Sequence, residues 1–390
     1  MTVELQLPIG ELELAFGQNL SKNPEQIIPR MGPQIKEYLL AHIHPMVAKD
    51  QPWKVEVKDM ALQKSEQTYS GPFQEIIVHL LLTPPQGAST RNFIFDYDVI
   101  MHQLVTHSAL VLLRSDWEAG KTHSEPTEIG VIRVDTKTTL IYPLAINLAE
   151  GSFWNGFKGM FALGQDHIKE GIDHLMFLLV LLLPIPLSFS KKKWETPRSI
   201  RESLLQIVKI VSAFTLGHSL TLLIGAMDWV VLPSKWIEIL IAFSILVSAI
   251  HAIRPIFAGK EMFVSLGFGL IHGLAFANTL IDFNLDSQSI IISVLGFNLG
   301  IEVMQLWIIL MVIPCLIFLS RTAYYSFFRV MAAIFAGIAA LAWMMERYTQ
   351  KVNLMSAILN KSAAYLDQAL ITMALVSLLL FVYNKYKALN

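Results

Sequence analysis

The chain has 390 residues, of which 54% are hydrophobic and only 16% are charged, whereas about 25% are charged in a typical soluble domain. A formal net charge of −1 provides no basic field for nucleic acid, and a single cysteine excludes both an internal disulfide and a thiolate-rich metal site. The charge deficit is concentrated after residue 170, where long apolar runs begin, so the composition predicts a membrane protein with a soluble N-terminal part.

Residues 1–150 are predicted to form a soluble, mostly-β domain, resembling a β-sandwich. Alternating or β-branched runs predict strands within Val3–Phe16, Trp53–Leu62, Glu75–Leu82, Asn92–Met101, Ser108–Ser115 and Gly130–Leu148. One helix is predicted between Pro29 and His44 from apolar residues at helical spacing. His42 and His44 would form a surface metal-capture site only if this short stretch were a strand.

Residues 151–165 are predicted to form an amphipathic linker helix at the membrane interface, because Trp154, Phe157 and Phe161 fall on one side of it. Residues 166–390 are predicted to form a bundle of seven membrane-spanning helices. The expected spans are 167–188, 204–227, 234–253, 262–281, 289–319, 325–345 and 365–384.

Charges in the loops set the expected orientation. Basic residues collect in alternate loops, for example Lys191-Lys192-Lys193 after the first span and Arg254 with Lys260 after the third. Such loops face the cytoplasm, which places the N-terminal domain outside a bacterial inner membrane and the C-terminus in the cytoplasm. Because the chain opens without a basic and apolar leader, an export signal is expected upstream of residue 1.

The first span carries Asp166, His167, Glu170, Asp173 and His174. On a straight helix, two histidines seven residues apart would be separated by roughly 10.5 Å, too far to share one ion. The favoured pair is therefore Asp173 with His174, one as a metal ligand and the other as its orienting partner.

Further polar residues recur at the same predicted depth. His218 and His272 lie mid-span beside glycines that permit close helix packing. In the fifth span, Asn298, Glu302 and Gln305 form one polar stripe, and Glu238 lies just inside the outer interface. An ionised carboxylate inside a membrane costs about 2.5–3.5 kcal/mol on insertion scales, which favours a functional reason for keeping it.

These residues predict a metal site built from Asp173, His174, His218, His272 and Glu302, with Asn298, Glu238 and Gln305 in support. Imidazoles and carboxylates without sulfur suit a divalent transition metal, Ni²⁺, Co²⁺, Zn²⁺ or Cu²⁺, and the spacing does not choose among them.

Five ordered motifs over residues 164–305 resemble the HupE/UreJ family of bacterial membrane proteins, generally regarded as nickel or cobalt permeases and accessory proteins. They are His167-x5-Asp173-His174 followed by Leu-Met-Phe-Leu-Leu, Phe214-Thr-Leu-Gly-His218-Ser-Leu-Thr221, Glu238 with Ala242-Phe-Ser244, Gly269-Leu-Ile-His272-Gly-Leu-Ala-Phe276, and Phe297-Asn298-Leu-Gly-Ile-Glu302. The large N-terminal domain also looks like that of the longer members. The resemblance implies metal permeation, with His167, Asp173 and His174 matching the motif most associated with it, so His167 is added to the predicted metal ligands.

Three functions remain open at this point. The first is a permease that carries the metal inward, and the second is an intramembrane zinc hydrolase with Asp173 or Glu302 as general base and Ser219 or Ser244 in support. The third is a non-catalytic membrane scaffold that recruits a periplasmic partner through its β domain. A homo-oligomer is compatible with each of them, as is contact with membrane lipid.

Overall fold

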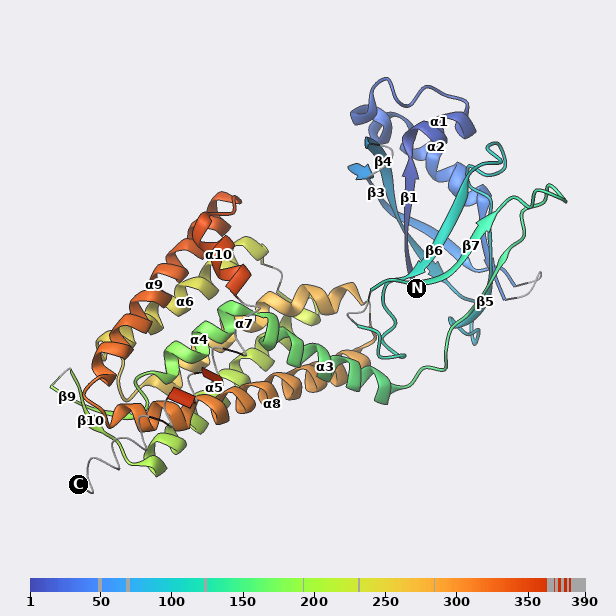
Figure 1. Cartoon of the computed structure of the whole chain (residues 1–390). Coiled ribbons are helices and arrows are strands. Elements are labelled where there is room, and N and C mark those ends of the chain that lie inside the picture. The colour runs from blue at the N-terminus through green and yellow to red at the C-terminus, as the bar shows by residue number, and fades with distance from the viewer. Residues whose placement is uncertain are drawn as a thin grey trace. The chain divides into compact units, whose positions relative to one another are not determined.

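The computed structural model describes residues 1–47, 51–67, 71–122, 125–191, 193–230, 232–283 and 285–362, together with a few isolated positions after 367. Contacts divide the chain into two compact units, Met1–Ser152 and Phe153–Asn390. The first is rich in strands and the second is built mainly of helices (Figure 1).

Small antiparallel sheets make up most of the N-terminal unit. One has the order β1-β4-β3 and a second the order β2-β5-β8, while β6 pairs with β7. The strands are β1 Thr2–Pro8, β2 Ile43–Met46, β3 Lys54–Gln67, β4 Gly71–Thr83, β5 Asn92–Tyr97, β6 Ser108–Leu113, β7 Thr127–Arg133 and β8 Leu144–Asn147. Their inward side chains and those of two helices form a single apolar core, and the predicted β-rich character of this unit is confirmed.

The run Val3–Phe16 does not form one strand as predicted. Strand β1 ends at Pro8, and the chain turns directly into helix α1 (Ile9–Phe16), which ends at Gly17 with a left-handed φ of 69°. Ile9 and Leu12, three residues apart, are the buried residues of this helix, and helical spacing overrides the apparent alternation. The helix predicted between Pro29 and His44 is confirmed as α2 (Ile27–His42), after a short 3₁₀ turn η1 (Pro24–Gln26).

The second unit contains a series of helices and one short β-hairpin. They are α3 Phe153–Glu170, α4 Ile172–Leu182, β9 Leu187–Ser190, β10 Lys193–Pro197, α5 Ile200–Ala226, α6 Ser234–Ile253, α7 Glu261–Asp282, α8 Ser287–Ser320, α9 Tyr325–Thr349 and α10 Leu354–Ser362. Within the described residues, four helices are long and apolar enough to cross a membrane, namely α5, α6, α8 and α9. They coincide with the second, third, fifth and sixth predicted spans, and α7 occupies the position of the fourth.

The first predicted span, 167–188, is not one helix. Helix α3 continues past the predicted boundary between residues 165 and 166 and ends at Glu170. Gly171 interrupts the helix, and α4 follows with only 11 residues, a length of about 16 Å. That is shorter than the roughly 30 Å hydrocarbon core. The seventh predicted span, 365–384, lies outside the continuously described residues.

Glycines allow two pairs of helices to pack closely. A Cβ added at Gly269 of α7 would lie 2.2 Å from the carbonyl oxygen of Phe214 in α5, and one at Gly300 of α8 would lie 2.1 Å from that of Phe161 in α3. Backbones can approach this closely only where no side chain intervenes. Figure 1 shows α3 lying along α8. These two contacts hold the helices that carry the polar residues of the candidate site.

Candidate metal centre

A break in the backbone at Gly171 brings His167 and His174 together. Gly171 has φ −76° and ψ 88°, outside the helical region, and the ring centroids of the two histidines are 4.5 Å apart. The expectation that these residues are too far apart to share an ion is therefore wrong, because it assumed a straight helix. A Cβ at Gly171 would lie 2.6 Å from the carbonyl oxygen of His167, so only glycine fits this corner without displacement.

Two more imidazoles from other helices complete a buried cluster. His272 of α7 lies 5.0 Å from His174 between ring centroids, and His218 is contributed by α5. All three residues are buried: His174 is 8% exposed, His218 is 1% exposed and His272 is 0% exposed. The ring of Phe297 lies 5.4 Å from His167 and 6.2 Å from His218, which joins the two ends of the cluster through an aromatic wall.

The neighbour of His272 determines which of its ring nitrogens carries the proton. Ser244 Oγ lies 2.7 Å from the carbonyl oxygen of Ile241 and 3.1 Å from His272 Nε2, and with its one hydrogen assigned to the carbonyl its oxygen accepts from Nε2. The proton then resides on Nε2, and Nδ1 of His272 carries the lone pair.

His218 and His174 are held in the same way. Asn298 donates through its amide nitrogen to the carbonyl of Val294 at 2.8 Å, so its amide oxygen accepts from His218 Nδ1 at 3.0 Å. Asp173 accepts from His174 Nδ1 at 2.9 Å. In both histidines the lone pair is therefore on Nε2.

The nitrogens of His174, His218 and His272 that carry lone pairs are buried without a partner, as is one ring nitrogen of His167. In the described part of the chain, buried ring nitrogens without a hydrogen-bond partner include His167 Nε2, His174 Nε2, His218 Nε2 and His272 Nδ1. An unpaired polar atom in a dry interior is unfavourable unless a ligand satisfies it. An imidazole lone pair whose opposite nitrogen is hydrogen-bonded is the usual form of a metal-binding histidine.

The imidazoles are linked in series by ring contacts, which join His167 to His174 and His174 to His272. In the helical unit, no three described His, Cys, Asp or Glu side chains place their ligand atoms all within 4.8 Å of one another. A closed site for a tightly held ion needs three or four protein ligands around one point. The arrangement therefore suits successive, partly shared coordination better than one closed site.

Charged side chains lie at one end of this series. Arg347, in the last turn of α9, pairs with Asp173 (Nη2 to Oδ2, 3.4 Å) and with Glu238 in the first turns of α6 (Nε to Oε2, 3.2 Å). Asp173 and Arg347 are about one-fifth exposed, and Glu238 is 47% exposed. This end of the cluster is thus both the most polar and the most accessible.

Only one residue of the predicted polar stripe of α8 has a described contact with the imidazole cluster. Asn298 contacts His218, but Glu302 is half-buried with no interaction to the four imidazoles among the described contacts, and Gln305 is buried with its amide oxygen unpartnered. Sequence reasoning missed Arg347, which it treated as a loop charge. No pattern near Arg347 indicates that the end of α9 lies beside the start of α4.

The helical unit matches one family of known proteins. The family model described as HupE/UreJ protein matches residues 145–347, just over half of the chain and the whole of the cluster. No curated protein and no solved structure matches the chain. The chain belongs to the HupE/UreJ family of membrane proteins, a family regarded as nickel/cobalt transporters.

Proposed function

We propose that the helical unit moves a divalent transition-metal ion, nickel or cobalt, across the membrane. The observation that carries this proposal is the set of four imidazoles that each have one buried ring nitrogen without a hydrogen-bond partner among the described residues. Imidazole is a favoured ligand for both ions, and the absence of sulfur donors accords with them. Because protons compete with the metal for each lone pair, we expect transport to slow as the pH falls.

The spacing of the ligands supports transport over hydrolysis. A zinc hydrolase holds its ion at a fixed three-ligand site with one open position, whereas conduction needs several sites that each bind weakly enough to release. The second arrangement is supported because no three of the described metal-ligating groups in this unit converge within 4.8 Å.

A second buried polar pair, His251 and Glu261, lies at the far end of α6, and His251 Nδ1 accepts from the N–H of Phe257 at 3.3 Å. His251 Nε2 lies 3.9 Å from Glu261 Oε1, and Gln206 donates to the other carboxylate oxygen at 3.2 Å. Thirteen residues separate Glu238 from His251 on α6, about 20 Å at 1.5 Å per residue. We infer that an ion enters beside Asp173 and Glu238 and leaves beside His251 and Glu261.

The direction follows from the charge rule. The β9–β10 hairpin and the loops after α6 and α8 carry Lys191, Lys193, Arg254 and Arg321, so we place them in the cytoplasm and the N-terminal unit outside a bacterial inner membrane. The test is thiol labelling of right-side-out vesicles in a Cys315→Ala background. Lys351→Cys should react in sealed vesicles and Lys193→Cys only after permeabilisation. The reverse pattern would overturn the orientation.

The function is tested in proteoliposomes loaded with a metal-sensing dye. Wild-type protein should admit Ni²⁺ or Co²⁺, and His174→Ala and His272→Ala should each lose at least tenfold in initial rate. His79→Gln, an exposed histidine of the N-terminal unit, serves as the control and should match wild type. A tightly bound ion without flux would indicate the hydrolase, and neither binding nor flux would indicate the scaffold.

The variant Glu261→Gln tests the proposed exit independently of metal binding at the imidazole cluster. It should slow flux while leaving equilibrium binding of Ni²⁺ at the cluster unchanged, because Glu261 is hydrogen-bonded to Gln206 and lies near the end of α6 opposite Glu238. Unchanged flux in this variant would contradict the proposed exit.

A further inference from the structure

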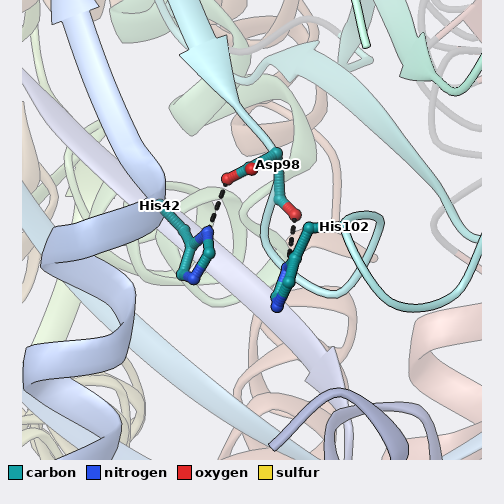
Figure 2. Close-up of side chains that lie close together, drawn as sticks. All are labelled: His42, Asp98 and His102. Atoms are coloured by element: carbon teal, nitrogen blue, oxygen red, sulfur yellow. Dashed lines mark hydrogen bonds and ion pairs between the residues drawn. The ribbon is translucent and has the colours of Figure 1, made fainter. Parts of the chain in front are cut away.

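Three metal-ligating side chains meet in the N-terminal unit, apart from the helical cluster. They are His42, Asp98 and His102 (Figure 2). His42 is the last residue of α2, Asp98 directly follows β5, and His102 lies in the turn after Asp98. Among the described residues, these three place one ligand atom each within 4.8 Å of the others. Each is partly buried, so the group is accessible to an ion without being a freely moving surface cluster.

The hydrogen bonds of this group direct two lone pairs outward. His42 Nδ1 donates to the carboxylate of Asp98 at 2.7 Å, and His102 Nδ1 donates to the backbone carbonyl of Asp98 at 3.2 Å. Both acceptors are oxygens without a hydrogen, so each Nδ1 carries the proton and each Nε2 the lone pair. The two rings are stacked, with centroids 4.1 Å apart and planes inclined by 15°.

The backbone around the group is fixed by the core. Strand β2 pairs with β5, and Asp98 N donates to His42 O at 3.2 Å, which ties the end of α2 to the end of β5. Ile100, fully buried, has a left-handed φ of 67°, and its N–H donates to Tyr38 Oη at 2.9 Å. A β-branched residue holds that conformation only when its surroundings enforce it, so the turn carrying His102 is rigid.

We propose that His42, Asp98 and His102 form a second, exchangeable site for a divalent transition-metal ion. His42 and His102 bind through Nε2, while Asp98 orients His42 and supplies negative charge. Because stacked rings do not direct their lone pairs at one point, one ring must turn about χ2 before both imidazoles bind the same ion, and this torsion has a broad minimum. Two imidazole ligands leave coordination positions for water, which suits an ion that exchanges with solvent rather than a structural ion.

The neighbouring His44 does not belong to this site. It lies in β2, is exposed, and its Nε2 contacts the carbonyl of Ala41 at 2.9 Å. The sequence suggested pairing His42 with His44, but His42 ends a helix, and the two rings take different partners. His44 therefore provides a matched control, a histidine two residues away that the proposal predicts to be dispensable.

The test uses the full chain in detergent, with His174→Ala and His272→Ala removing the helical cluster. Titration with Co²⁺ should show one saturable ion per chain by equilibrium dialysis, with a d–d absorption band. Adding His102→Phe, which preserves the ring stack but deletes the nitrogens, or Asp98→Asn should weaken this binding at least tenfold. Adding His44→Ala should leave it unchanged. Binding that survives His102→Phe, or no saturable binding in the starting variant, would overturn the proposal.

A second measurement keeps the test valid if the starting variant does not fold. In the otherwise wild-type chain, His102→Phe should lower the Co²⁺ stoichiometry by one ion while leaving Ni²⁺ flux through the helical unit measurable. An unchanged stoichiometry would overturn the proposal. Because the proposed function is tested by flux and this site by stoichiometry, either one can fail without the other.

Discussion

Asp173 and Arg347 form an ion pair between the first turn of α4 and the last turn of α9, with 3.4 Å between Oδ2 and Nη2. The other oxygen of Asp173 accepts from His174 Nδ1 at 2.9 Å. One carboxylate thus connects the guanidinium to the first imidazole of the series. Under the proposed function, a metal ion bound at His174 Nε2 is stabilised by the negative charge of Asp173 behind the ring, and the guanidinium of Arg347 offsets part of that charge.

Removing this guanidinium should strengthen metal binding. In Arg347→Gln, Asp173 loses a competing cation, and we expect the affinity for Ni²⁺ to rise about 5–30-fold, the equivalent of roughly 1–2 kcal/mol. Isothermal titration of the purified chain measures it. Lys351→Gln, which removes a positive charge four residues further along the chain, after the end of α9, is the control and should change little. Equal or weaker affinity in Arg347→Gln would mean that the ion pair is only structural.

Ser244 should act on the metal through His272. Ser244→Ala removes the acceptor that keeps the proton on His272 Nε2, so the lone pair on Nδ1 is no longer secured. Loss of such an orienting partner typically weakens metal binding about 10–100-fold. Ser248→Ala is the matched control, because Ser248 is equally buried on the same helix but donates to the carbonyl of Ser244. If the two variants bind Co²⁺ equally well, the assignment of the His272 proton is wrong.

Gly171 should be required for the convergence of His167 and His174. In Gly171→Ala the new Cβ would lie 2.6 Å from the carbonyl of His167, and alanine favours continuing the helix. We expect the two rings to separate and the affinity for Co²⁺ to fall at least tenfold, as measured by equilibrium dialysis. The comparison is Gly337→Ala, where the nearest atoms are 3.8 Å from the added Cβ. Wild-type binding in Gly171→Ala would show that the break is not needed.

Much of the site could be predicted from the sequence because each residue is unusual in its local context. A histidine such as His218 or His272 in the middle of an apolar run stands out without any structure. The four long spans were equally predictable, since length and hydropathy decide them. The β-rich N-terminal unit followed from alternation over many residues.

What the sequence could not show depends on contacts between distant segments. The helix break at Gly171 is one glycine in a motif that also fits a straight helix, so His167 was placed too far from His174. Arg347 meets Asp173 across 174 residues of sequence. His42 meets Asp98 and His102 because β2 pairs with β5, a register that the pattern of either strand alone does not specify.

The close packing of α7 against α5 should depend on Gly269 and not on Gly267, which lies two residues earlier on the same helix. A Cβ at Gly269 would lie 2.2 Å from the backbone oxygen of Phe214, whereas one at Gly267 would have none of the described heavy atoms within 4 Å. Backbone cannot yield as a flexible side chain can, so Gly269→Ala must separate the helices that carry His218 and His272. Overpacking of this kind costs about 1–3 kcal/mol.

Gly267→Ala on the same helix provides the control for this substitution. It should preserve or slightly raise stability, because alanine favours a helix over glycine by roughly 1 kcal/mol. Thermal unfolding in detergent with metal absent measures the stability of both variants, and Co²⁺ binding reports the cluster. We expect Gly269→Ala to lower both the unfolding temperature and the metal affinity, and Gly267→Ala to lower neither. Equal behaviour of the two variants would show that α5 and α7 do not make this close contact.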